Sequence, residues 1–170
     1  MSYWTMVVRT LAWIPRISLI NKGSAVRERT CHAHTPHNVS TTGTILIVDD
    51  EPMVRLVVAR LLEEWHFRVL EADDGRTALQ LAADFKGTLS MVITDLTMPY
   101  MDGYDFARSF RPLHPDVPIL FMTGKSPNTV VGSFFGTGDN LLFKPFDPDT
   151  FLDAVARLLE SYINLGRITA

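Results

Sequence analysis

The sequence of 170 residues is poor in cysteine, in long apolar runs and in excess charge. Its single cysteine, Cys31, excludes an internal disulfide framework and a zinc site built from CxxC pairs. No stretch reaches the roughly 18 uninterrupted apolar residues that a membrane-spanning helix needs. A net charge of −3 is too small to make nucleic acid or a membrane surface the default partner. We therefore expect a cytoplasmic protein that binds neither directly.

Charge is divided unevenly along the chain. Residues 1–43 carry five basic side chains and one acidic side chain, whereas residues 44–170 carry 11 basic and 18 acidic side chains. The first segment therefore has a net charge of +4 and the second of −7, which indicates an appendage on an acidic domain. We expect an N-terminal extension at 1–43, a domain at 44–163 and a short tail at 164–170.

The extension allows several interpretations. Cys31, His32, His34 and His37 are metal-ligating residue types at close spacing. The Arg-rich, acid-poor composition is also typical of a transit peptide. We favour a disordered His-rich tail, or a chain start assigned too far upstream, because nothing in the pattern orders the four side chains.

Short apolar runs alternate with segments of helical periodicity from Thr44 onward. The run at 44–48 is apolar after its threonine, which is typical of a strand covered on both faces. The helix after it begins at Pro52 and repeats apolar residues at helical spacing up to Trp65. The same patterns predict strands at 67–70, 91–94, 118–122 and 141–143, and helices starting near Asp73–Asp74, running through Phe106 and Phe110, spanning 126–135, and following the N-cap Asp147. Five strands that alternate with five helices predict a doubly wound α/β fold with a parallel sheet.

Polar side chains stand at the carboxyl ends of four predicted strands. They are Asp49 and Asp50, Asp95, Thr123, and Lys144. Each alone could be a turn, cap or solvated residue, but the carboxyl ends of parallel strands meet where such folds bind ligands. Three carboxylates repel one another unless a cation lies among them, and oxygen ligands suit Mg²⁺. A nearby lysine and hydroxyl would bind a phosphoryl group.

Four ordered motifs carry a family resemblance. They are ILIVDDEP at 45–52, ITDLTMPYMDG at 93–103, MTG at 122–124 and KPF at 144–146. The chain resembles the receiver domain of two-component response regulators over about residues 44–163, and is most similar to receivers attached to hybrid sensor histidine kinases. The resemblance implies a flavodoxin-like fold whose five parallel strands have the order 2-1-3-4-5.

The resemblance also implies a role for each motif residue. Asp95 matches the phosphoacceptor, whose carboxylate attacks the phosphorus of a phosphohistidine. The implied Mg²⁺ ligands are Asp50 directly, Asp49 directly or through water, Asp95, and the backbone carbonyl of Thr97. The implied phosphoryl-binding groups are the Thr123 hydroxyl, which also acts as a switch, the Gly124 amide and the Lys144 side chain.

One position departs from the family pattern. Many receivers carry an aromatic residue three positions before the lysine, and this ring moves inward when the switch hydroxyl turns to the phosphate. Leu141 occupies that position here and has no phenol to bury or expose. We therefore expect the loop after Thr123 and the predicted helix at 126–135 to carry the signal.

The expected function is that of a stand-alone phosphorelay module that signals and is not an enzyme. Its implied partners are a sensor histidine kinase or a histidine phosphotransfer protein, and a target protein that binds residues 126–135 and the strand at 141–143. The alternative is an Mg²⁺-dependent phosphohydrolase with an aspartate nucleophile. Such enzymes need a second aspartate two residues after the first, where this chain has Thr97. Flavin binding is disfavoured further, because the carboxylates would repel the FMN phosphate.

Overall fold

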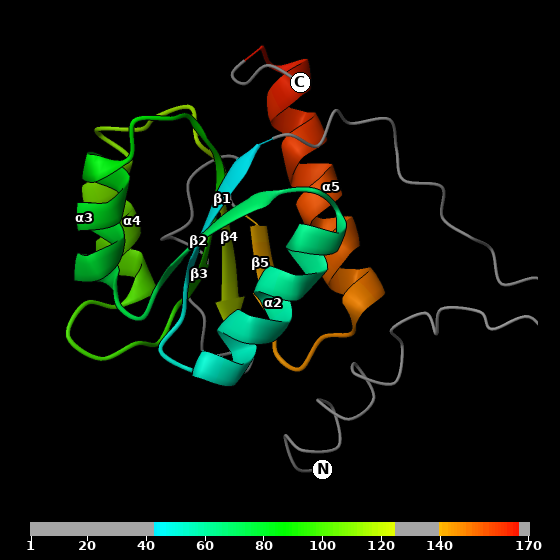
Figure 1. Ribbon diagram of the computed structural model, residues 1–170, viewed down its shortest axis with the longest axis horizontal. Helices are drawn as coiled ribbons and strands as arrows, with labels where there is room; N and C mark the ends of the chain where they lie inside the picture. Colours follow the sequence, from blue (N-terminus) through cyan, green and yellow to red (C-terminus); the bar gives the residue numbers. More distant parts are fainter. Residues whose placement is uncertain (1–42, 125–139, 167–170) are drawn as a thin grey trace, which may run out of the picture. The chain divides into compact units, whose positions relative to one another are not determined.

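The computed structural model describes residues 43–124 and 140–166, in which five strands form one parallel sheet (Figure 1). The strands are β1 (Thr44–Val48), β2 (Arg68–Ala72), β3 (Leu89–Asp95), β4 (Ile119–Thr123) and β5 (Asn140–Phe143). Their order across the sheet is β2-β1-β3-β4-β5, and each neighbouring pair is parallel. The predicted fold class and strand order are confirmed.

Helices cover both faces of the sheet. They are α2 (Pro52–Glu64), α3 (Gly75–Asp84), α4 (Gly103–Phe110) and α5 (Pro148–Asn164). Figure 1 shows α2 and α5 on one face and α3 and α4 on the other. The buried apolar residues divide in the same way into two core clusters, one for each pair of helices.

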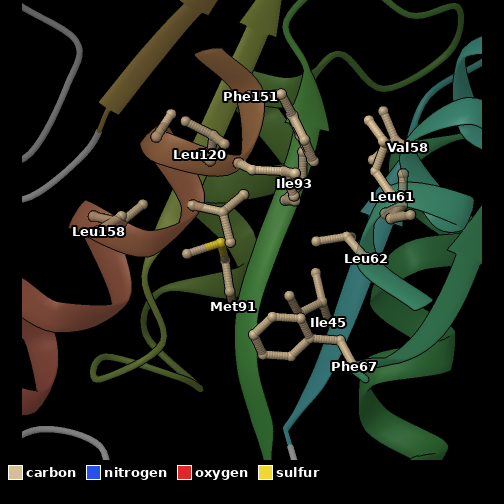
Figure 2. Close-up of a cluster of buried hydrophobic side chains, with 14 of the residues drawn as sticks. Ile45, Val58, Leu61, Leu62, Phe67, Met91, Ile93, Leu120, Phe151 and Leu158 are labelled. Carbon is tan, nitrogen blue, oxygen red and sulfur yellow. The ribbon is translucent and has the colours of Figure 1, made fainter. Parts of the chain in front are cut away.

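The alternation of side chains along β1 supplies both clusters. Ile45 and Ile47 belong to the cluster under α2 and α5, whereas Leu46 and Val48 belong to the cluster under α3 and α4. All four are fully buried, because successive side chains of a strand point to opposite faces and both faces are covered. In Figure 2, side chains of α2 and α5 meet those of β1, β3 and β4 in the first cluster.

Two helices begin as their sequences predict. The Asp147 side chain accepts a hydrogen bond from the Thr150 amide at 2.9 Å, and Pro148 is the first residue of α5. The helix predicted to start near Asp73–Asp74 begins at Gly75, with Asp74 as its N-cap. These caps satisfy backbone amides that have no partner within the helix.

One predicted strand is displaced along the chain. The strand predicted at 67–70 is β2, which spans Arg68–Ala72 and leaves Phe67 outside the ladder. The Phe67 amide donates to the Leu62 carbonyl at 3.1 Å, and His66 has a positive φ of 65°. The chain therefore turns back against the end of α2, and Phe67 is buried in the core before the strand starts.

Some predictions fall outside the described residues. They are the extension with Cys31, His32, His34 and His37, the helix at 126–135, and most of the tail at 164–170. These elements and the domain boundaries stay predictions. Within the two described segments, no helix combines the length and the apolar character needed to cross a membrane.

Candidate functional site

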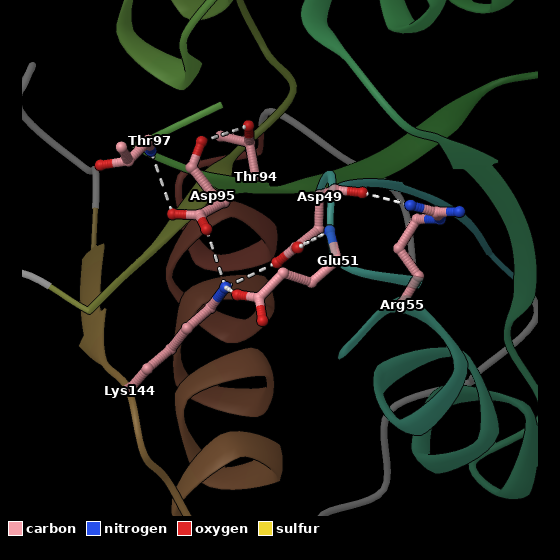
Figure 3. Close-up of polar contacts among 7 residues, drawn as sticks. All are labelled: Asp49, Glu51, Arg55, Thr94, Asp95, Thr97 and Lys144. Carbon is pink, nitrogen blue, oxygen red and sulfur yellow. Dashed lines mark hydrogen bonds and ion pairs between the residues drawn. The ribbon is translucent and has the colours of Figure 1, made fainter. Parts of the chain in front are cut away.

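Three charged side chains from the ends of three strands meet at one edge of the sheet (Figure 3). Asp49 follows β1, Asp95 ends β3 and Lys144 follows β5. The Lys144 Nζ donates to Asp49 Oδ2 at 2.7 Å and to Asp95 Oδ2 at 2.8 Å. The lysine side chain is 7% exposed, Asp49 is fully buried and Asp95 is 7% exposed. Both hydrogen bonds of Lys144 are therefore charge-assisted and largely shielded from water.

Burial and charge act in opposite directions on the pKa values of this trio. Burial is the largest influence on Asp49 and raises the pKa of its carboxyl, although the hydrogen bond and charge of Lys144 act to lower it. Burial also acts to lower the pKa of Lys144. Its hydrogen bonds and charge contacts with Asp49 and Asp95 outweigh that effect, so the pKa of Lys144 lies above its ordinary value of 10.5. The lysine is therefore cationic at neutral pH and compensates two closely spaced carboxylates.

Glu51 joins this cluster, although the sequence analysis did not single it out. One carboxylate oxygen from each of Asp49, Glu51 and Asp95 lies within 4.8 Å of the other two. Glu51 Oε1 is 3.6 Å from Lys144 Nζ, and the Glu51 side chain is 47% exposed. Its amide donates to Asp49 Oδ1 at 2.9 Å. The sequence could have indicated this residue, because Glu51 is the last of three consecutive acidic residues that follow β1.

The backbone around Asp95 is restrained from several directions. The Thr97 amide donates to Asp95 Oδ1 at 3.1 Å, and the Thr94 hydroxyl donates to the Asp95 carbonyl oxygen at 3.0 Å. Helix α4 begins directly against that carbonyl, and a Cβ on Gly103 would overlap the carbonyl oxygen. Glycine at position 103 therefore lets α4 pack against the backbone of Asp95.

The other predicted site residues lie at different depths. Thr123 is fully buried at the end of β4, and Gly124 follows it in an exposed position. Leu141 is partly buried and packs against the core cluster under α3 and α4. Asp50 and Thr97 are exposed, and Asp50 is not among the described carboxylates that cluster. The structure therefore brings Asp49, Asp95 and Lys144 together, whereas the role of Asp50 as a direct ligand stays a prediction.

The donor chemistry of the cluster fits a small divalent cation. Three carboxylates from the turn after β1 and the end of β3 present oxygen atoms within a span of 4.8 Å. Mg²⁺ prefers oxygen ligands, uses only one or two protein carboxylates in many sites, and keeps several water molecules. The partial exposure of Glu51 leaves the cluster accessible to water.

Comparisons with known proteins show which family this chain is similar to. A model of the response regulator receiver domain matches residues 45–156. The sensor kinase CckA of Brucella abortus is 32% identical over 128 residues, which cover 72% of this chain and 13% of the kinase. The chain spans less than half of the length of the first curated relatives that it matches.

Solved structures that resemble this chain include a receiver domain and a response regulator protein. The crystal structure of the receiver domain from the hybrid histidine kinase CckA is 37% identical, with a TM-score of 0.60, and the match covers 69% of this chain and 99% of that chain. The response regulator protein TrrA of Thermotoga maritima, solved in complex with Mg(2+)-BeF, is 28% identical with a TM-score of 0.59. That match also covers 69% of this chain and 99% of TrrA.

Proposed function

We propose that this chain, which belongs to the response regulator receiver domain family, accepts a phosphoryl group on Asp95 and signals through altered protein contacts in a phosphorelay. The observation that carries the proposal is Lys144, held at hydrogen-bond distance from both Asp49 and Asp95. A fixed cation beside a buried carboxylate is suited to stabilise the charge of a transferring phosphoryl group.

In the proposed step, a carboxylate oxygen of Asp95 attacks the phosphorus of a phosphohistidine. An O–P bond forms, the P–N bond breaks, and the imidazole leaves with the electron pair of that bond. The product on Asp95 is an acyl phosphate. Lys144 already lies 2.8 Å from Asp95 Oδ2, so it is placed to pair with the phosphoryl oxygens as they arrive.

We assign Mg²⁺ to the acidic cluster of Asp49, Glu51 and Asp95. Asp50 and the Thr97 carbonyl are the further ligands that the family resemblance implies. When bound, the ion would neutralise charge on the transferring phosphoryl group. Two observations support this assignment: the close spacing of the three carboxylates, and the Mg²⁺ in the solved structure of a relative.

The proposed switch starts at Thr123, which ends β4 next to the site. Its hydroxyl would donate to a phosphoryl oxygen, with the Gly124 amide as a second donor. Leu141 stands where many receivers carry the aromatic readout, and its contact with the core under α3 and α4 supports a response by repacking of an aliphatic side chain.

The proposed phosphoryl donor is a sensor histidine kinase or a histidine phosphotransfer protein in the cytoplasm. The proposed output is contact with a target protein through residues 126–135 and β5, without direct binding of nucleic acid. We assign the chain a signalling role in place of catalytic turnover, in keeping with its family.

Mass spectrometry after incubation with acetyl phosphate and Mg²⁺ tests the proposal. Wild-type protein should gain one phosphoryl group that hydroxylamine removes, and chelation of Mg²⁺ should prevent the gain. Asp95→Asn should stay unlabelled, while Asp153→Asn, which changes an exposed aspartate on α5, should be labelled like the wild type. Labelling of Asp95→Asn at the wild-type level would contradict the assignment of the phosphoacceptor.

A further inference from the structure

The side chain of Arg55 reaches back from α2 to the end of β1 (Figure 3). Its Nη1 donates to the backbone carbonyl oxygen of Asp49. Its Nε lies 3.7 Å from Glu71 Oε2 on β2, and the Arg55 side chain is only 17% exposed. A partly buried guanidinium therefore connects the start of α2 with the carboxyl ends of two strands.

The local backbone explains why the guanidinium arrives at this point. The Arg55 amide donates to the Glu51 carbonyl at 3.1 Å, which places Arg55 in the first turn of α2. Helical side chains lean toward the N-terminus of their helix, and here that direction leads to the turn after β1. The spacing of six residues between Asp49 and Arg55 lets a long side chain span this turn.

Asp49 lies just past the last pair of the ladder between β1 and β2. That ladder ends with Val48 opposite Ala72, and the Asp49 amide adds one more bond to the Ala72 carbonyl at 3.2 Å. The Asp49 carbonyl oxygen beyond it receives its hydrogen bond from Arg55. A buried carbonyl needs a hydrogen-bond donor. The Asp49 backbone is therefore held at its amide by the Ala72 carbonyl and at its carbonyl by Arg55.

We propose that Arg55 is a positioning residue for the acidic site. With the Asp49 backbone fixed, Asp49 Oδ1 can accept from the Glu51 amide while Oδ2 accepts from Lys144. Loss of the Arg55 bond would loosen the turn at 49–51 and spread the oxygens that the cluster brings together. The inference rests on the proposed function, because it takes Mg²⁺ as the ion that this cluster binds.

Geometry, and not the charge of the guanidinium, carries this role. The hydrogen bond of Arg55 in the turn goes to a backbone carbonyl, and its ion pair goes to Glu71, whose side chain is 50% exposed. An ion pair at 3.7 Å with a half-exposed glutamate contributes little. Arg55→Lys, which keeps a long side chain with a donor at its end, should therefore restore most of the site.

Isothermal titration calorimetry of Mg²⁺ binding to the folded chain tests the inference. Arg55→Met should weaken Mg²⁺ binding by about threefold to tenfold, because groups that orient metal ligands commonly affect affinity on this scale or more. Arg55→Lys should recover most of the affinity. Arg60→Met is the matched control, since Arg60 lies on the same helix with an exposed ion pair to Glu63. It should bind Mg²⁺ like the wild type.

Amide exchange of Glu51 in the metal-free protein gives a second measurement. Exchange should become faster in Arg55→Met and stay unchanged in Arg60→Met, because only the first variant releases the turn that holds the Glu51 amide on Asp49. If Arg55→Met folds too poorly for titration, Arg55→Gln replaces it, since its amide is too short to span the turn. It should weaken binding in the same way.

The outcomes separate the two proposals. Failure of the wild type to bind Mg²⁺ would refute the proposed metal site itself. Wild-type binding together with undiminished affinity in Arg55→Met or Arg55→Gln would overturn the positioning role and leave the proposed function standing. Weakened binding that Arg55→Lys does not restore would also overturn it.

Discussion

Replacement of Lys144 by methionine is the most demanding test of the site's electrostatics. The change keeps much of the side chain's length and removes the cation that Asp49 and Asp95 share. Removing one partner of a buried ion pair costs about 3 to 5 kcal/mol. We expect a loss of about 3 kcal/mol in the free energy of unfolding at neutral pH without Mg²⁺, because Asp49 can take up a proton and relieve part of the repulsion.

The pH dependence of this loss has a definite sign. Burial raises the pKa of Asp49 above 3.8 in the folded protein, and Lys144 opposes that rise. Without Lys144 the folded-state pKa of Asp49 rises further. A carboxyl whose pKa is raised on folding contributes stability at low pH, and this contribution is lost as pH rises through the folded-state pKa. The difference between wild type and Lys144→Met should therefore be small at acidic pH and grow toward neutral pH.

Urea unfolding in chelator over a series of pH values measures this difference. Lys86→Met is the matched control, because Lys86 is exposed, and it should change stability little at any pH. Added Mg²⁺ should recover part of the stability of Lys144→Met by supplying another cation. A loss below about 1 kcal/mol at neutral pH, the scale of a surface pair, would refute the reasoning. A loss that is the same at every pH would refute it as well.

Two further predictions concern the elements that hold the site. Gly103→Ala should cost about 2 kcal/mol in unfolding free energy and slow phosphorylation, because its methyl group would overlap the Asp95 carbonyl oxygen. Chemical denaturation of Gly103→Ala measures the stability effect. Gly124→Ala is the control, because its methyl group would meet open space. Asp147→Ala should cost about 1 kcal/mol at neutral pH by removing the cap of α5. The Thr150 amide lowers the pKa of Asp147, so the cap's contribution is present above 3.8 and lost as pH falls through the lowered folded-state pKa, which thermal unfolding at several pH values would show.

The central strands were predictable from sequence because their environment leaves a simple pattern. The strand β1 is covered on both faces, so its continuous apolar run predicted both its bounds and its burial. The strand β2 lies at the edge of the sheet and mixes exposed and buried residues. Its start at Arg68 depends on the turn at His66 against the end of α2, which the local alternation did not show.

The site was predictable to the extent that it follows from strand ends. Asp49, Asp95 and Lys144 meet because parallel strands bring their carboxyl ends to the same edge of the sheet. Glu51 and Arg55 were missed because their contacts depend on the geometry of one turn and on the reach of a helical side chain. Neither contact produces a periodic signal in the sequence.

The restrained backbone of Asp95 bears on how the proposed phosphoryl transfer would be separated from the proposed output. The strand β3 has a neighbour on each side, and α4 packs against the Asp95 carbonyl, so this backbone has little room to move. Among the residues that the structure describes, the strand β5 has a sheet neighbour on one side only. A conformational response should therefore start on the β4–β5 side. Under the proposed function, a change of protein partner then requires changes only on that surface, while the residues proposed to receive the phosphoryl group stay in place.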